Sequence, residues 1–370
     1  MKISQITYTG FGGLGSVVFS LVAAGVSCEH RWSIGFIGDQ PLDGSYVQRC
    51  RDDGVEYAAF QSTPGKPFRA WWALARWLAQ TQPEAVICHS INSILACRWY
   101  AWRHGARLVA VEHTPNQVKT RNERVFSRLA MLLADRVVVL TPEYRDELHR
   151  AHGLLFRGHK VAVVPNGIDT EVFRPAEMPS QELMGPGRVL TIGMAARFSF
   201  SKRQDLLVKV LERLAVLQPA LEVQLRFAGD GSEMRRVKAL AHASPLGQRI
   251  RFDGLLSEEA VAPWLRELDI YVHATEGETL STSLLQAMAT GLPIVASDIP
   301  GVRNLLQGVD FFGDCVENTS AAFATAVCRC VDDPRLAVEL GRRARARIVE
   351  QYSNRAMLDA YLELVDEAKR

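Results

Sequence analysis

Short apolar runs alternate with amphipathic segments along almost all of the 370 residues, and this alternation constrains the fold more than any other feature. Parallel strands that are buried on both faces give such runs, and the segments between them have the spacing of helices that cover a sheet. The pattern therefore predicts an α/β chain with parallel sheets. The expected strands are residues 3–8, 32–37, 56–60, 85–89, 107–112, 136–141, 160–164, 189–194, 224–228, 250–252, 270–273 and 294–296.

The alternation pauses once, between two series of strands. Pro165-Asn166-Gly167 is a turn signal, and residues 174–187 form a polar stretch with proline and glycine that is typical of a linker. We therefore predict two doubly wound, Rossmann-like domains facing across a cleft, residues 1–168 and 169–354. The last segment, residues 355–370, is expected to be a helix that packs back on the first domain.

Several classes of protein are disfavoured by composition. No run approaches the ~20 apolar residues of a membrane span, and the N-terminus lacks the layout of a signal peptide. The seven cysteines form no C-x-x-C pair, so a zinc site or a disulfide framework is not expected and a cytoplasmic location is. Net charge is +2, with 19 basic and 13 acidic residues in positions 1–168. This excess is too small to indicate a nucleic-acid partner.

A glycine loop, Gly10-Phe11-Gly12-Gly13-Leu14-Gly15, follows the first expected strand and opens a helix. The G-x-G-x-x-G spacing favours an NAD site, with Asp39 at the end of the next strand as the acid for the ribose. The same loop can hold any phosphate, carboxylate or sugar oxygen, because it presents free amides at a helix N-terminus. It can also be a tight turn without a ligand.

The second half has a more specific set of polar residues. Arg197 and Lys202 follow one strand, Gly231 follows the next, and Glu278 precedes a helix expected over 281–290 that carries Gln286. All lie at carboxyl ends of strands or at helix starts, where α/β sheets bind ligands. Two cations and a helix N-terminus suit a diphosphate, and an acid beside them suits sugar hydroxyls. A purely structural interpretation also remains: Arg197 and Lys202 could be solvated loop charges, and Glu278 could be a helix cap.

These motifs resemble those of the retaining glycosyltransferases of family 4, which have the two-domain GT-B fold. The R-x4-K element matches Arg197 and Lys202, and E-x7-E matches Glu278 as its first acid. "LLQAMATGLP" at 284–293 follows the family's "LLEAMACGxP", and "VVPNGID" at 163–169 is similar to its interdomain segment. The resemblance covers nearly the whole chain.

The resemblance implies a role for each matched residue. Arg197, Lys202 and Glu278 would be catalytic, and His113 would face the donor sugar, although a histidine at a strand end is often only structural. His89 has a similar position and a weaker match. The residues implied to bind the donor nucleotide are Gly12, Gly13, Gly231, Leu280, Ser281, Thr282 and Gln286.

Gln286 departs from the family, which has an acid here for the ribose hydroxyls. An amide can still exchange hydrogen bonds with a diol, but it loses the assistance of a charge. We expect donor binding to survive, weakened by about 1 kcal/mol.

The resemblance implies transfer of a sugar from a UDP- or GDP-linked donor to a hydroxyl of a glycan acceptor. The leaving phosphate would take the acceptor proton, and fixed positive charge would stabilise the leaving group. No metal or cofactor is implied, since the two cations replace the metal and no D-x-D element lies at a sheet edge. The acceptor is expected to be lipid-linked or part of a cell-envelope polysaccharide such as lipopolysaccharide.

Five of the seven tryptophans fall between residues 71 and 102, among four arginines. Two helices packed in the core would explain them. A basic, aromatic surface resting on anionic lipid would explain them as well, and would make the protein peripheral on the inner face of the cytoplasmic membrane.

Three other functions stay open from the sequence. An NAD-dependent dehydrogenase would use Gly10–Gly15 and leave Arg197, Lys202 and Glu278 without a role. A nucleotide-sugar epimerase of the same architecture would act without an acceptor. A sugar-binding homologue without activity is the alternative that Gln286 favours.

Overall fold

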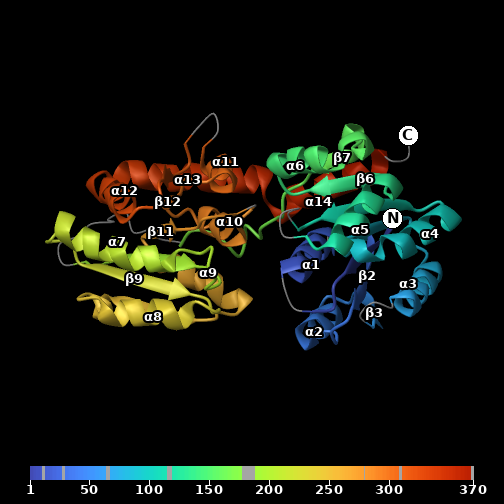
Figure 1. The fold of residues 1–370 in the computed structure, drawn as a ribbon, viewed down its shortest axis with the longest axis horizontal. Coiled ribbons are helices and arrows are strands. Elements are labelled where there is room, and N and C mark those ends of the chain that lie inside the picture. Colours follow the sequence, from blue (N-terminus) through green and yellow to red (C-terminus); the bar gives the residue numbers. More distant parts are fainter. Residues whose placement is uncertain are drawn as a thin grey trace. The chain divides into compact units, whose positions relative to one another are not determined.

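The computed structural model in Figure 1 describes residues 1–10, 13–26, 30–63, 67–114, 119–176, 188–278, 280–307 and 311–367. It divides into two compact units. Unit 1 is Met1–Gly167 with Asn354–Arg370, and unit 2 is Ile168–Ser353. The division differs by one residue from the predicted boundary after residue 168, and the final helix belongs to unit 1.

Unit 1 has a sheet of seven parallel strands in the order β3-β2-β1-β4-β5-β6-β7. The strands are rich in β-branched residues, and most of their side chains are buried, as expected of strands covered by helices on both faces. Their bounds are β1 (Lys2–Thr7), β2 (Arg31–Gly38), β3 (Glu56–Gln61), β4 (Ala85–Cys88), β5 (Arg107–Glu112), β6 (Arg136–Val139) and β7 (Val161–Val163).

Two hydrophobic cores lie against this sheet. Helices α1 (Gly13–Val26), α2 (Gly44–Asp52) and α14 (Asn354–Glu367) contribute to one. Helices α3 (Phe68–Thr81), α4 (Ile94–His104), α5 (Arg121–Leu133) and α6 (Pro142–His152) contribute to the other. Local signals set the helix ends: Thr120 and Glu123 form a capping box at the start of α5, and Gly105 ends α4 in the left-handed conformation.

Unit 2 has a sheet of six parallel strands in the order β10-β9-β8-β11-β12-β13. Its strands are β8 (Leu190–Ala195), β9 (Val223–Ala228), β10 (Ile250–Gly254), β11 (Ile270–His273), β12 (Ile294–Ser297) and β13 (Asp314–Val316). Its helices are α7 (Gln204–Leu217), α8 (Met234–Ala243), α9 (Glu258–Arg266), α10 (Thr282–Ala289), α11 (Pro300–Leu306), α12 (Ser320–Asp332) and α13 (Pro334–Gln351). Separate cores again form, one with α7, α8 and α12 and one with α9, α10 and α11.

The final helix shows why unit 1 is discontinuous in sequence. The Gly167 amide donates to the Met357 sulfur of α14 at 3.1 Å, and a Cβ at Gly167 would lie 2.8 Å from the Asn354 backbone. Met357 and Leu358 are buried in the core that α1 shares. The α14 helix therefore completes unit 1.

All expected strands are present, with ends that differ from the expected ones by at most two residues. Only β13 was not predicted, because three residues among polar neighbours give no apolar run. Part of the predicted linker, residues 177–187, lies outside the described residues. Among the described residues, no helix combines the length and apolar composition needed to cross a bilayer.

The tryptophans of residues 71–102 differ in their exposure. Trp71 and Trp77 are half-buried and pack against the core beneath α3, so core packing is correct for them. Trp72, Trp99 and Trp102 are exposed.

Candidate functional site

A cavity of about 610 Å³ lies in unit 2, where the loops after β8, β9, β10 and β11 meet. Strands β8 and β11 are neighbours, but the chain leaves β8 toward β9 on one side and β11 toward β12 on the other. Doubly wound sheets bind ligands at such a reversal, outside the carboxyl ends of the strands. The residues singled out in the sequence that line the cavity are Arg197, Lys202, Glu278, Leu280, Ser281, Thr282 and Gln286.

Two glycines let the loops after β8 and β9 approach each other. Gly229 has φ +132°, and a Cβ there would lie 2.1 Å from the Ala196 carbonyl oxygen. Gly231 has φ +152°, and its Cβ would lie 2.3 Å from the Phe198 carbonyl oxygen. Any larger residue would push these loops apart. Gly229 lines the cavity, whereas Gly231 is not among the lining residues and supports the loop that carries Arg197.

Lys202 and Glu278 form an ion pair in the wall of the cavity. The buried His273, the last residue of β11, lies with its Nε2 3.5 Å from the Glu278 Oε2 and makes no hydrogen bond through Nε2 to a described residue. Tyr271, also buried, donates to the Ala195 carbonyl at 3.1 Å and lies 3.5 Å from the His273 Nδ1. The ion pair of Lys202 and Glu278 thus lies next to the buried side chain of His273, which in turn lies against Tyr271.

Burial shapes the protonation of this group. It lowers the pKa of Lys202 to about 8, because the ammonium is largely withdrawn from water. Burial, and then the charge of Lys202, hold the pKa of His273 well below its usual value, so this imidazole is neutral. Of the described residues Lys202, His273 and Glu278, Lys202 is therefore the one that carries a positive charge, and it can lose that charge near pH 8.

Two other groups that could bind an anion line the cavity, namely Arg197 and the start of α10. Arg197 makes no ion pair with any described residue, so its guanidinium is available to a ligand. The N-terminus of α10 opens on the cavity, capped by the Ser281 hydroxyl, which accepts from the Leu284 amide at 3.4 Å. The amides of a first helical turn have no partners within the helix and favour negative charge.

One side of the cavity is polar and another is apolar. Thr282 and Gln286 are four residues apart on α10 and share the face that lines the cavity, while Leu284 and Leu285 are buried in the core. Leu255, Leu256 and Val261, from the loop after β10 and from α9, provide an apolar surface. A ligand with an anionic group, a diol and a planar apolar part would match these walls.

Some lining residues were missed in the sequence. Leu255 and Leu256 come shortly after the predicted strand 250–252, which was the available signal. His273 was counted as the end of a strand, and its place beneath Glu278 depends on the pairing of β11 with β8, which sequence spacing does not give.

The residues predicted in the first half belong to unit 1. Gly12 lies outside the described residues, and Gly13 is the first residue of α1. His89 and His113 follow β4 and β5, and the His89 Nδ1 lies 3.0 Å from the His113 Nε2. Burial lowers the pKa of His113 to about 4 and that of His89 well below its usual value, so both rings are neutral.

Asp39, the predicted ribose acid of an NAD site, accepts a hydrogen bond from the Tyr8 hydroxyl at 2.7 Å. This bond and burial raise the pKa of Tyr8 to about 12.

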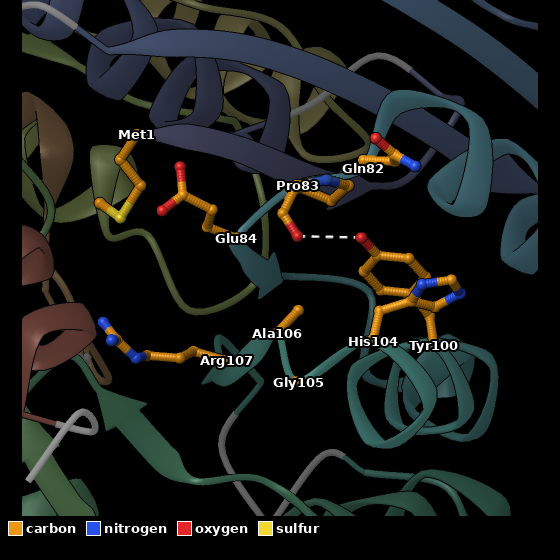
Figure 2. A pocket seen from close by; sticks show the side chains of 9 residues that line it. All are labelled: Met1, Gln82, Pro83, Glu84, Tyr100, His104, Gly105, Ala106 and Arg107. Atoms are coloured by element: carbon orange, nitrogen blue, oxygen red, sulfur yellow. Dashed lines mark hydrogen bonds between the residues drawn. The ribbon is translucent and has the colours of Figure 1, made fainter.

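A second hollow, of about 390 Å³, lies in unit 1 (Figure 2). It is lined by residues at the amino ends of β4 and β5, whereas His89 and His113 follow the carboxyl ends of these strands. Three of the hollow's polar side chains already have partners within the protein. The Tyr100 hydroxyl donates to the Pro83 carbonyl at 2.9 Å, Glu84 accepts from the Lys2 amide at 3.1 Å, and Arg107 lies 3.8 Å from Asp366. This hollow is therefore not our candidate site.

Family profiles match both halves of the chain. Residues 11–172 match the description "Glycosyltransferase Family 4", and residues 189–333 match "Glycosyl transferases group 1". The second match contains the cavity.

Characterised relatives have modest identity. The D-inositol 3-phosphate glycosyltransferase of Xylanimonas cellulosilytica is 26% identical over 78% of this chain and 69% of its own length. The lipopolysaccharide core biosynthesis glycosyltransferase LpsE of Rhizobium meliloti is 29% identical over 63% of this chain and 61% of its own.

Among solved structures, Anabaena Alr3699/HepE in complex with UDP has a TM-score of 0.81 at 17% identity, over 99% of this chain and 100% of that one. The same protein in complex with UDP-glucose has a TM-score of 0.78. With its two doubly wound units, the chain has the GT-B fold of glycosyltransferases. It belongs to glycosyltransferase family 4.

Proposed function

We propose that this glycosyltransferase is a retaining hexosyltransferase that uses a nucleotide-diphosphate sugar, UDP- or GDP-linked, and transfers the sugar to a hydroxyl of a glycan acceptor. The observation that carries the proposal is the cavity of unit 2, which combines Arg197, Lys202 and the start of α10 with an apolar wall. The UDP and UDP-glucose complexes of the structural neighbour support a donor of this class.

The walls suggest where each part of the donor binds. The diphosphate would contact Arg197, Lys202 and the first amides of α10, and the base would lie against Leu255 and Leu256. Gln286 would bind the ribose hydroxyls, and Glu278 would accept from hydroxyls of the sugar once Lys202 turns to the phosphate. Such preorganised positive charge is worth most where negative charge develops, on the leaving phosphate.

The reaction breaks the bond between the anomeric carbon and the leaving phosphate oxygen and forms a bond from that carbon to the acceptor oxygen. In a retaining transfer both events occur on one face of the sugar. The leaving phosphate then takes the acceptor proton, so that the products are the glycoside and the nucleoside diphosphate. This route needs no pair of catalytic carboxylates, no metal and no cofactor.

We further propose that the acceptor is lipid-linked and belongs to lipopolysaccharide or another envelope polysaccharide, with the enzyme at the cytoplasmic face of the membrane. The relative named for lipopolysaccharide core biosynthesis supports this class of acceptor.

The test is to incubate the purified chain with radiolabelled UDP- and GDP-sugars and an acceptor-containing membrane extract. Transfer of label to the glycan fraction, with retention of the anomeric configuration by NMR, is expected from one donor. An Arg197→Ala/Lys202→Ala double variant is the matched inactive control. Conversion of the donor sugar without an acceptor would instead identify an epimerase, and failure of all donors would contradict the proposal.

A further inference from the structure

The outward faces of α3 and α4 expose large aromatic side chains. Phe68 and Trp72 are four residues apart on α3 and are 70% and 67% exposed. Leu95, Trp99 and Trp102 share one face of α4, and the two tryptophans are 53% and 71% exposed. The opposite faces of both helices are buried in the core. Both helices are therefore apolar on two sides.

These faces join into one surface, because α3 and α4 are neighbours (Figure 1). A hollow of about 460 Å³ lies between them, lined among others by Trp71, Trp72, Leu95 and Trp99. We call this the α3–α4 surface, and we include Arg69, Arg76 and Arg103 in it. Contiguous apolar patches of this kind mark interaction sites.

The charge of the surface has one sign. Neither helix contains an aspartate or a glutamate. The Arg98 guanidinium lies 3.5 Å from Asp135, but Arg69, Arg76 and Arg103 form no ion pair with any described residue. Arg76 lies 5.7 Å from the centre of the Trp72 ring, so that charge and aromatic surface face outward together.

We propose that the α3–α4 surface binds the face of an anionic lipid bilayer. Indole rings suit the boundary between head groups and acyl chains, and arginines reach the lipid phosphates from that depth. Unpaired arginines without neighbouring acids add attraction to anionic lipid. The inference rests on the proposed lipid-linked acceptor only as the reason why the enzyme would bind a membrane. The observations that carry it come from unit 1 and do not involve the cavity of unit 2.

The test is co-sedimentation of the full chain with phosphatidylcholine vesicles, with or without about 30 mol % phosphatidylglycerol. Anionic vesicles should bind at least tenfold more tightly. Vesicles with brominated acyl chains should quench tryptophan fluorescence. The variants Trp72→Ser/Trp102→Ser and Arg69→Gln/Arg76→Gln/Arg103→Gln should each lose at least tenfold in binding.

The matched control is Arg335→Gln/Leu336→Ser, which removes an exposed arginine and an exposed leucine from α13. It should bind vesicles like the native chain, and all variants should bind UDP or GDP as the native chain does, which separates this proposal from that for the donor. Equal binding to both vesicles, or unchanged binding of the variants, would overturn it. So would a native dimer that the tryptophan variant makes monomeric, because the surface would then be covered by a second copy.

A different observation in unit 1 carries a second inference. Gln5 of β1, His89 after β4 and His113 after β5 form a chain of hydrogen bonds across three neighbouring strands. The Gln5 Nε2 donates to the Val18 carbonyl at 3.5 Å, and its Oε1 lies 2.9 Å from the His89 Nε2. The His89 Nδ1 lies 3.0 Å from the His113 Nε2.

The direction of each bond follows from the carbonyl at one end. Since Val18 can only accept, the Gln5 amide nitrogen faces it and the Gln5 oxygen faces His89. Both histidines are neutral, so each has one N–H. His89 uses its proton at Nε2 to reach Gln5, and its bare Nδ1 must accept from the His113 Nε2. The Nδ1 of His113 is then left as an acceptor.

We infer that Gln5 and His89 are positioning residues that hold His113 as the Nε2–H tautomer, so that its Nδ1 accepts from a substrate hydroxyl. The fixed tautomer of His113 follows from the chain of hydrogen bonds alone. Only the identification of its partner as a substrate hydroxyl rests on the proposed function. A histidine free to exchange tautomers would present a donor to that hydroxyl part of the time.

The readout is ¹⁵N NMR of the histidine side chains at neutral pH, with His113→Asn to assign the signals. The native chain should show His113 protonated at Nε2. Gln5→Met, which removes the acceptor, should give a mixture of tautomers and lower kcat several-fold with little change in the donor KM, whereas Gln5→Glu should restore a single tautomer. Ser4→Ala is the control, because it removes another buried hydrogen bond of β1, to Ser33 at 2.7 Å. An Nδ1–H His113 in the native chain, or a single tautomer in Gln5→Met, would overturn the inference.

Discussion

The proposed contact of Lys202 with the diphosphate predicts that the affinity for a nucleoside diphosphate depends on pH. Its pKa of about 8 means that the ammonium is present below pH 8 and is lost as the pH rises through that value. At pH 9 about one side chain in ten keeps its proton, and binding a diphosphate must restore it at a cost of about 1.4 kcal/mol. We therefore expect binding of UDP or GDP to be about tenfold weaker at pH 9 than at pH 7.

Isothermal titration calorimetry at the two pH values measures this effect, and Lys202→Arg separates it from other ionisations. A guanidinium keeps its charge at pH 9, so the variant should bind with nearly the same affinity at both values. Lys209→Arg, at an exposed position of α7, is the matched control and should behave as the native chain. A native affinity that is flat between pH 7 and pH 9, or an equal loss in Lys202→Arg, would refute the assignment of Lys202 to the diphosphate.

Three further predictions concern the cavity and the loops that support it. Arg197→Ala and Lys202→Ala should each lower turnover by ~10²-fold or more while the circular dichroism spectrum stays that of the native fold, and near-normal turnover in both would contradict their role at the leaving group. Activity should persist in EDTA, so complete loss that Mg²⁺ or Mn²⁺ reverses would show a metal requirement. Gly231→Ala should destabilise unit 2 by about 1–3 kcal/mol in urea unfolding, because its φ of +152° and the nearby Phe198 carbonyl leave no room for a Cβ; unchanged stability would contradict this reasoning.

The fold could be predicted because buried parallel strands leave a signal in the sequence that does not depend on tertiary detail. The position of the cavity in unit 2 could be predicted for the same reason, since Arg197, Lys202 and Glu278 lie in the loops that follow such strands. The features that could not be predicted depend on which strands pair with each other and on which face of a helix is exposed. The contact of His273 with Glu278 requires the pairing of β11 with β8. Periodicity alone did not separate the exposed Trp72 and Trp102 from the core, because both faces of their helices are apolar.

Gln286 tests the interpretation at the position where the sequence departs from its family. Its side chain is half-buried on the cavity face of α10, so it can reach a diol held beside the helix start. Gln286→Glu adds a charge-assisted hydrogen bond worth about 1–2 kcal/mol, which repulsion from the donor phosphates and from Glu278 partly offsets. Calorimetry with the nucleoside diphosphate should therefore give unchanged to about tenfold tighter binding, whereas Gln286→Ala should weaken binding more than it lowers kcat. Gln248→Ala, at an exposed position far along the chain from α10, is the control. If Gln286→Ala binds the nucleotide as tightly as the native chain, the ribose lies elsewhere, and the missing acid has no bearing on donor affinity.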